Sequence, residues 1–206
     1  MDNKALYKLS YGLFVLGSKA DDKENACITN TCMQITSSPT KVAIAVINTN
    51  YTCDLIKQSG VFAVTILDIS TPFSLIENFG YQSGRNADKF ASVKPEHDIN
   101  GCSYLKEHAS AVLSCKVESS QDLGSHTLFI AEVIEAEVLG DNEPLTYAYY
   151  QANIKPKREE AKTDKKIVGW KCKICGYTYE GAALPEDFTC PWCGHGPEDF
   201  EPVYAE

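Results

Sequence analysis

The stretch that decides the fold of the C-terminal part is WKCKICGY at residues 170–177, followed by CPWCG at residues 190–194. It contains two Cys-x-x-Cys-Gly turns, with fourteen residues between Cys175 and Cys190. In each turn two thiolates flank the bend, and the following glycine leaves room for backbone amides to approach sulfur. Two such turns facing each other form a tetrahedral cage of four sulfurs, which suits Zn²⁺ or a single iron. The predicted ligands of one metal ion are Cys172, Cys175, Cys190 and Cys193.

The segment that carries these cysteines is short. Residues 167–206 are only 40 in number, and a chain of that length rarely buries enough apolar surface to fold unaided. A structural metal contributes on the order of 10 kcal/mol to the folding of such a module. We therefore expect residues 167–206 to form a small domain that folds around its ion.

Five aromatic side chains accompany the predicted ligands. They are Tyr177, Tyr179, Phe188, Trp192 and Phe200. An iron site benefits from an apolar shell that limits water, whereas a zinc ribbon needs little beyond its ligands. The strings CGYTY at 175–179 and PEDFTCPWCG at 185–194 resemble rubredoxin, in the shortened form found as a tail on other redox proteins. This resemblance implies one Fe(Cys)4 centre that carries one electron, with a zinc ribbon as the alternative.

Composition and charge narrow the class of protein. No apolar run is long enough to span a bilayer, and the N-terminus lacks a basic-then-apolar export signal, so we expect a cytoplasmic protein. The net charge is −9, of which residues 167–206 carry −5. An acidic tail argues against nucleic acid, which requires clustered Lys and Arg. It suits docking to a basic patch on a protein partner, or serves only solubility.

A charged segment separates the tail from the rest of the chain. Residues 156–166 read PKREEAKTDKK and contain no apolar side chain larger than that of alanine. Such a composition is typical of a linker, although a charged helix is the competing interpretation. We therefore expect a first domain at 1–155, a linker at 156–166 and a second domain at 167–206.

Residues 1–155 are dominated by short runs typical of strands. The expected strands cover 11–19, 26–36, 42–47, 61–67, 110–117 and 126–138. Helices are expected at 3–9, from Thr52 as N-cap to Gly60, and from about Pro72 to Gly80. The strand–helix alternation of a doubly wound sheet is missing, and so is its Gly-x-Gly-x-x-Gly loop. These features predict a mainly β domain, an antiparallel barrel with short helical inserts.

Three polar clusters interrupt these strands. They are residues 29–31 together with Gln34, residues 48–52 and residues 83–86. Hydroxyls, amides, an arginine and a helix N-terminus are what a phosphate and a polyol chain need. Each cluster by itself is also compatible with an ordinary turn, so composition alone leaves an anionic cofactor and simple turns open.

The order of the clusters resembles the flavin reductase family of FMN-binding split barrels. The matching strings are NACITNTCMQITSSP at 25–39, NYT at 50–52, SGRNADKF at 83–90 and GSHTLFIAEV at 124–133. The family implies a homodimer with one FMN per subunit near the dimer interface. Its isoalloxazine and ribityl groups would face Thr29, Asn30, Thr31 and Gln34. Its phosphate end would face Asn48, Asn50, Tyr51, Thr52, Ser83, Gly84, Arg85 and Asn86.

His126 is the catalytic candidate, since the resemblance implies that it lies near the flavin face where nicotinamide docks. A lone histidine on a strand is equally well explained as a hydrogen-bonded structural residue.

Barrel and tail together resemble the high-molecular-weight rubredoxins of anaerobic bacteria. The resemblance implies an oxidoreductase that takes electrons from NAD(P)H through FMN to iron, and on to a protein acceptor. The implied acceptor is a flavodiiron nitric oxide or oxygen reductase, in nitric oxide detoxification. The alternatives are a flavin reductase that releases reduced FMN and carries a structural zinc ribbon, and a non-enzymatic FMN-binding module.

Overall fold

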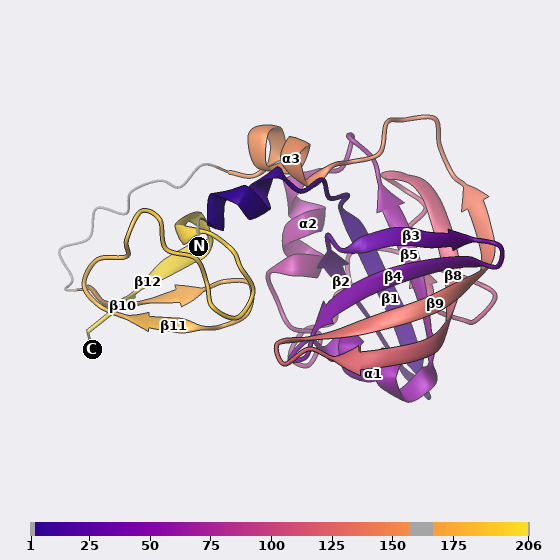
Figure 1. Cartoon of the computed structure of the whole chain (residues 1–206), viewed down its shortest axis with the longest axis horizontal. Coiled ribbons are helices and arrows are strands. Elements are labelled where there is room, and N and C mark those ends of the chain that lie inside the picture. The colour runs from indigo at the N-terminus through magenta and orange to yellow at the C-terminus, as the bar shows by residue number, and fades with distance from the viewer. Residues whose placement is uncertain (1–2, 157–166, 206) are drawn as a thin grey trace. The chain divides into compact units, whose positions relative to one another are not determined.

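The computed structural model describes residues 3–156 and 167–205 (Figure 1). The chain divides into two compact units, Met1–Lys155 and Pro156–Glu206. Each unit has hydrophobic clusters of its own. The expected linker falls almost entirely on residues 157–166, which lie outside the described residues.

Within the described part of the first unit, one antiparallel sheet dominates. Its strands in spatial order are β2 (Lys23–Thr29), β1 (Phe14–Ala20), β5 (Val61–Leu67), β8 (Ala109–Asp122), β9 (His126–Val138), β4 (Thr40–Ile47) and β3 (Cys32–Ser37). A separate short pair consists of β6 (Glu96–His97) and β7 (Ser103–Tyr104). The prediction of a mainly β domain is confirmed.

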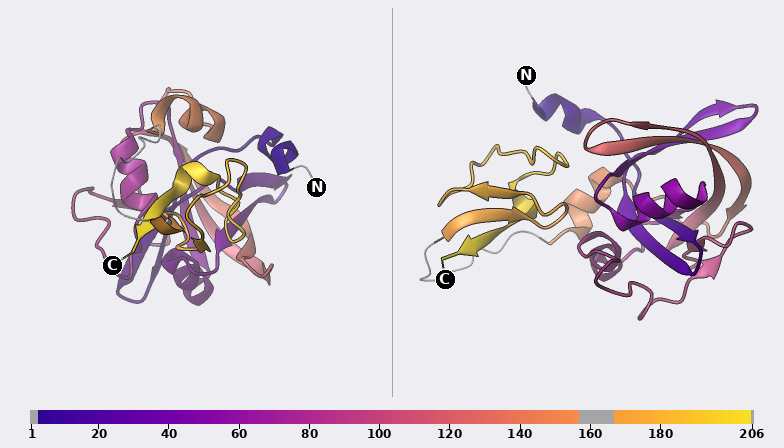
Figure 2. Two further views of the ribbon diagram at one scale, coloured as in Figure 1. Left: turned by 90° about the vertical axis from the view of Figure 1, so that its left-hand side faces the viewer. Right: turned by 90° about the horizontal axis from the view of Figure 1, so that it is seen from below.

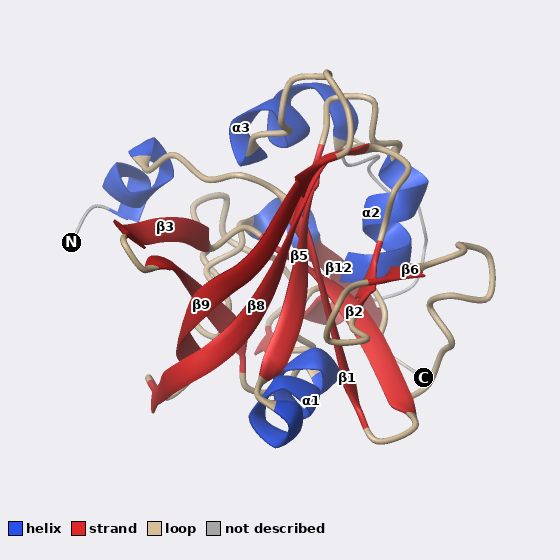
Figure 3. Cartoon of the chain, turned by 90° about the vertical axis from the view of Figure 1, so that its right-hand side faces the viewer, coloured by secondary structure: helices blue, strands red, loops and turns tan. Residues whose placement is uncertain are grey.

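The sheet closes on itself because of its connectivity. β2 and β3 occupy its two ends, yet only Asn30 and Thr31 separate them in the chain. The sheet must therefore curl until its first and last strands meet at these two residues, and Figure 3 shows this curvature. The side-chain hydroxyl of Thr31 donates a hydrogen bond of 2.7 Å to the carbonyl oxygen of Ala45 in β4, which holds the junction in place. The result is a barrel whose end strands meet at a single turn.

The expected single strand at 26–36 is therefore wrong. The alternation over residues 26–36 is imperfect, and the three consecutive polar residues Thr29, Asn30 and Thr31 are the only local sign of a break. In the structure the chain leaves one edge of the sheet at Thr29 and joins the opposite edge at Cys32. The physical reason is that β2 pairs with β1 whereas β3 pairs with β4, and these two pairs lie at opposite ends of the strand order.

The barrel interior is a close-packed apolar core. β4 alternates between buried and less buried positions, as expected of a strand with one face inside. The largest side chains that are fully enclosed here include Leu16, Ile44, Phe62 and Phe129. Burial of each such side chain stabilises the fold by roughly 1.5–3 kcal/mol relative to its exposure. The core thus fixes the strands whose ends carry the polar clusters.

Two helices flank the barrel. α1 (Tyr51–Ser59) packs on β1 and β2 at one end of the strands, and α2 (Phe73–Gly80) follows Pro72. The N-cap of α1 is Asn50, whose side-chain oxygen accepts from the Thr52 backbone N–H at 3.0 Å. The expectation that Thr52 caps this helix is wrong, because the Thr52 hydroxyl lies inside the first turn and bonds elsewhere.

Shorter helical pieces complete the first unit. They are the 3-10 helix η1 (Asn3–Lys8), the helical turn α3 (Tyr147–Tyr149) and the π-helix η2 (Tyr150–Ile154). None of the helices in the described ranges is both long and apolar enough to cross a membrane.

The second unit is a small sheet with an aromatic core. Its strands are ordered β11 (Thr178–Glu180), β10 (Ile167–Cys172) and β12 (Phe200–Tyr204), and the 3-10 turn η3 (Pro197–Asp199) precedes the last strand (Figure 2). Phe188 packs edge-on to both Tyr179 and Phe200, with ring centroids 4.8 and 5.4 Å away. This cluster surrounds the four cysteines, so core and ligand set form one unit.

Candidate functional site

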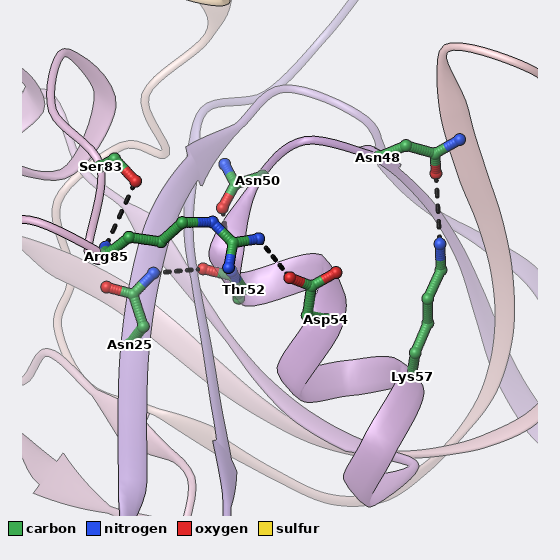
Figure 4. Close-up of polar contacts among 8 residues, drawn as sticks. All are labelled: Asn25, Asn48, Asn50, Thr52, Asp54, Lys57, Ser83 and Arg85. Atoms are coloured by element: carbon green, nitrogen blue, oxygen red, sulfur yellow. Dashed lines mark hydrogen bonds and ion pairs between the residues drawn. The ribbon is translucent and has the colours of Figure 1, made fainter.

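The N-terminus of α1 gathers most of the predicted phosphate-side residues (Figure 4). The guanidinium carbon of Arg85 lies 5.0 Å from the centre of the Tyr51 ring, and the guanidinium forms an ion pair with Asp54 in the first turn. Asp54 was not among the predicted site residues. The positive end of the helix and the half-exposed guanidinium each favour an anion, and the Asp54 carboxylate offsets part of this positive charge.

The loop that carries Arg85 is a tight turn. The backbone N–H of Arg85 donates to the Ser83 hydroxyl at 3.2 Å, and the backbone N–H of Asn86 donates to the Ser83 carbonyl at 3.1 Å. These bonds fix the direction in which the loop presents its side chains. Of these loop residues, Arg85 reaches α1, through its ion pair with Asp54 and its position over the Tyr51 ring.

The threonine cluster lies at the junction between β2 and β3. The hydroxyls of Thr29 and Thr31 are 3.3 Å apart, and Thr31 reaches the backbone of β4 close to its end. Because β4 leads directly into α1, this contact places the junction at the same end of the barrel as the helix N-terminus. Gln34 lies further along β3, where its exposed amide donates to the Thr36 carbonyl at 3.1 Å.

Asn48 is oriented differently from the other predicted residues. Its amide nitrogen donates to the Asp122 carboxylate at 3.0 Å and to the Gly124 carbonyl at 2.8 Å. Its oxygen accepts from the Thr127 hydroxyl at 2.5 Å. Both amide protons are therefore used in tying β4 to the β8–β9 hairpin. Figure 4 shows Asn48 away from Arg85, beside Lys57. The structure does not bring Asn48 into the phosphate-side group.

His126 is the first residue of β9 and pairs with Ile47 at the end of β4. Its Nδ1 lies 2.8 Å from the Ser125 hydroxyl, and the ring is half-buried. Because Ile47 is the last residue of β4, His126 lies beside the start of the loop that leads from β4 into α1. Its catalytic role stays a prediction.

The buried residue Asn25 also lies in this region, although it was not among the predicted site residues. Asn25 of β2 donates to the Thr52 hydroxyl in α1 at 2.9 Å. The only signal for it was its position at the start of the string 25–39. Contacts of this kind join residues far apart in the chain, so local pattern does not reveal them.

The four cysteines of the second unit converge on one point. Their sulfur atoms all lie within 4.8 Å of one another, with 3.6 Å between Cys172 and Cys193 and 3.4 Å between Cys175 and Cys190. A tetrahedral ion with metal–sulfur bonds of about 2.3 Å requires sulfur–sulfur separations of roughly 3.8 Å. The sulfur spacing therefore fits a single ion.

Local backbone geometry builds this cage. Gly176 and Gly194 follow the two Cys-x-x-Cys pairs with φ of 80° and 74°, and their N–H groups donate to the carbonyls of Cys172 and Cys190. Only glycine adopts this left-handed conformation without strain. The hydrogen bond with Cys193 lowers the pKa of Cys172, which favours the thiolate, the form that binds metal.

In comparisons with known proteins, a different family matches each of the two units of the chain. The flavin reductase like domain family matches residues 6–156, and the rubrerythrin, rubredoxin-like domain family matches residues 170–201. High molecular weight rubredoxin of Moorella thermoacetica is 37% identical over 98% of this chain and 100% of that protein. The ferric-chelate reductase (NAD(P)H) of Archaeoglobus fulgidus is 38% identical over 79% of this chain and 96% of that protein.

A solved structure supports the barrel. The NADH:FAD oxidoreductase SgcE6 of Streptomyces globisporus C-1027 superposes with a TM-score of 0.63, covering 69% of this chain and 84% of that chain. At 21% identity this similarity concerns the fold alone.

Fold, site and comparisons define the class of protein: an oxidoreductase in which a flavin reductase-like barrel is fused to a rubredoxin-like domain. Within this class, the chain belongs to the high molecular weight rubredoxin family. The family implies FMN in the barrel and one iron in the four-cysteine site. Arg85 beside the N-terminus of α1 fits the phosphate, and the four sulfurs fit the iron. Which individual residues touch the flavin stays a prediction.

Proposed function

We propose that this protein transfers electrons from NAD(P)H to a protein acceptor, using FMN in the barrel and iron in the tail. The observation that carries the proposal is the presence, in one chain, of a flavin reductase-like barrel and a complete four-thiolate cage. The bound groups supply the redox chemistry: a flavin accepts hydride, and a four-thiolate iron holds one electron at a time. NAD(P)H as donor is supported by the ferric-chelate reductase (NAD(P)H) among the relatives.

The protein's own residues hold and orient these groups. We assign the phosphate end of FMN to the α1 N-terminus and its facing loop, with residues Asn50, Tyr51, Thr52, Ser83, Gly84, Arg85 and Asn86. We assign the ring end to Thr29, Asn30, Thr31 and Gln34. Asn48 is left out, because its amide is used by the hairpin. Cys172, Cys175, Cys190 and Cys193 hold the iron, and His126 is the candidate for contact with nicotinamide.

The domain and subunit organisation belongs to the same proposal. We take 1–155 as the flavin domain, 156–166 as linker and 167–206 as the rubredoxin-like domain, supported by the two compact units. A homodimer is supported by the edge strand β3, which exposes Met33 and Ile35 at 65% and 40%. A cytoplasmic location is supported by the nine cysteines, none of which forms a disulfide in the described residues.

We further propose that the acceptor is a protein of the flavodiiron nitric oxide or oxygen reductase type. The rubredoxin-like segment has a net charge of −5, which favours docking to a basic surface. Two of its ligands, Cys175 and Cys193, are only half-buried, and the neighbouring Trp192 is 50% exposed. The iron site is therefore close to a surface that a partner can reach.

Replacement of Cys172 by serine tests the transfer route. The Cys172→Ser protein is expected to retain anaerobic bleaching of its flavin by NADH and to lose reduction of a purified flavodiiron acceptor. A Cys102→Ser exchange in the barrel is the matched control and should preserve both activities. Loss of flavin bleaching together with acceptor reduction, or retention of both, would contradict the proposal.

The second candidate is a reductase that releases reduced FMN, with the tail as a structural zinc ribbon. It is favoured by the sulfur geometry, which fits a tetrahedral zinc as well as an iron. Metal analysis separates the two, because a ferric rubredoxin centre is red and a zinc site is colourless. The third reading, a binding module without enzymatic activity, is rejected if NADH bleaches the flavin of the pure protein.

A further inference from the structure

Asn25 occupies a buried position between two elements of the phosphate-side group. Its side chain is 3% exposed, and its amide nitrogen donates to the hydroxyl of Thr52 at 2.9 Å. Thr52 itself is fully buried in the first turn of α1. A buried polar pair of this kind must keep its hydrogen bond, because an unsatisfied buried group is strongly unfavourable. Asn25 therefore fixes the start of α1 relative to β2.

The other side of the same amide faces the loop that carries Arg85. A Cβ atom placed on Gly84 would lie 1.9 Å from the side-chain oxygen of Asn25. This is far below any real contact distance, so the loop backbone passes directly against the amide. Gly84 is required here for lack of space. One side chain thus contacts both α1 and the Ser83–Asn86 loop.

The downstream end of the loop is fixed by a buried lysine. Lys89 is 3% exposed, and its ammonium group donates to the carbonyl oxygens of Ala26 at 3.0 Å and Phe79 at 2.8 Å. Ala26 is the neighbour of Asn25 in β2, so this one strand contacts the loop at Gly84 and again downstream at Lys89. With the loop's far end anchored, the amide of Asn25 sets how closely the loop backbone at Gly84 approaches β2 and α1, while the Arg85 side chain itself pairs with Asp54 of α1.

We propose that Asn25 is a positioning residue that sets the preference of this protein for FMN over riboflavin. Without touching the cofactor, it holds the Arg85 loop at a fixed separation from the N-terminus of α1, so that both act on the same phosphate. This inference rests on the proposed flavin site. Riboflavin lacks the phosphate and shares the rest of the molecule, so its binding does not depend on this separation.

The test is a titration of full-length, flavin-depleted protein with FMN and with riboflavin, followed by flavin fluorescence. The Asn25→Ala protein is expected to bind FMN at least about tenfold more weakly, in line with the loss of a buried hydrogen bond. Its affinity for riboflavin should stay within about twofold of the original on the same scale. Asn142→Ala, which removes an amide bonded to Asp68 elsewhere in the unit, is the matched control and should change neither affinity.

A second variant, Gly84→Ala, tests the inference without relying on the Asn25→Ala protein. Gly84→Ala introduces a methyl group against the Asn25 oxygen and should also weaken FMN selectively. In the double variant Asn25→Ala/Gly84→Ala the obstructing oxygen is gone, so FMN should bind no more weakly than to Asn25→Ala alone. Additive losses would refute direct contact through Asn25. If Asn25→Ala does not fold, a Gly84→Ala protein with no FMN-selective loss refutes the inference.

The remaining outcomes are distinct. Equal weakening of FMN and riboflavin by Asn25→Ala, with unchanged circular dichroism, shows a general structural role and overturns the inference. Unchanged FMN affinity in that variant overturns it too, while leaving the flavin site in place. If the unaltered protein binds neither FMN nor riboflavin, the proposed flavin site itself is wrong, and the inference falls with it.

Discussion

Replacement of Arg85 by alanine tests the electrostatic basis of the proposed phosphate site. A hydrogen bond between a guanidinium and a phosphate contributes about 1.5–3 kcal/mol when charged groups are involved. The side chain of Arg85 is 46% exposed, so solvent screening places the expected loss in the lower half of this range. A loss of about 1.5–2 kcal/mol corresponds to a roughly 10- to 30-fold weaker affinity for FMN.

Lys57 provides a matched control on the same helix. Lys57→Ala removes the same unit charge from the last turn of α1, six residues after Tyr51. At 1.5 Å per residue this is about 9 Å along the helix axis, about one Debye length at physiological salt. Lys57→Ala should therefore change FMN affinity by less than about twofold.

The measurement is equilibrium titration of flavin-depleted protein with FMN and riboflavin at low and high salt. The Arg85→Ala effect should appear with FMN only and should shrink as salt is raised, because a half-exposed charge is screened. Arg85→Lys keeps the charge without the planar fork and should recover part of the affinity. Equal weakening of riboflavin, or an equal effect of Lys57→Ala, would refute the assignment of Arg85 to the phosphate.

Two further predictions concern stability. Burial raises the pKa of Asp68, but hydrogen bonds from Ser70 and Asn142 outweigh it and hold this pKa below its usual value. The stabilisation is present above the unfolded pKa of about 3.9 and is lost as pH falls through the folded pKa. Urea titrations should therefore show a shallower loss of stability below pH ~4 in Asp68→Asn, and an unchanged slope would contradict this. Removal of the metal should unfold only the rubredoxin-like unit, because its core is too small to fold alone. Trp170 and Trp192, the protein's only tryptophans, both lie in that unit. A chelator should therefore change the tryptophan fluorescence and leave the far-ultraviolet circular dichroism of the barrel strands unchanged. Loss of both signals would count against independent folding.

The metal cage shows what local sequence can predict. Each Cys-x-x-Cys-Gly turn is a local structure, because its glycine conformation and its backbone hydrogen bonds involve only neighbouring residues. The four ligands could therefore be named without a structure. The helix that ends at Gly60 was also predicted from local signals, a polar cap and a closing glycine, but its cap was placed at Thr52 and is Asn50.

The barrel junction shows where local patterns fail. The imperfect alternation of residues 26–36 predicts a strand, and it does not distinguish one strand from two strands separated at Asn30 and Thr31. Only the pairing of these strands with different partners decides between them. Strand pairing depends on contacts between distant segments, which no window of sequence contains.

The amino-acid sequence by itself determined the sulfur ligands, the mainly β character and the polar clusters at the ends of strands, because these depend on spacing and on short-range periodicity. The tertiary structure alone decided which polar residues work together. It turned Asn48 toward the β8–β9 hairpin, placed Arg85 over Tyr51 and brought Asn25 between α1 and the Gly84 loop. The physical reason is that the direction of these side chains follows from strand register and from their hydrogen-bonding and ion-pair partners, and both are set by the folded chain as a whole.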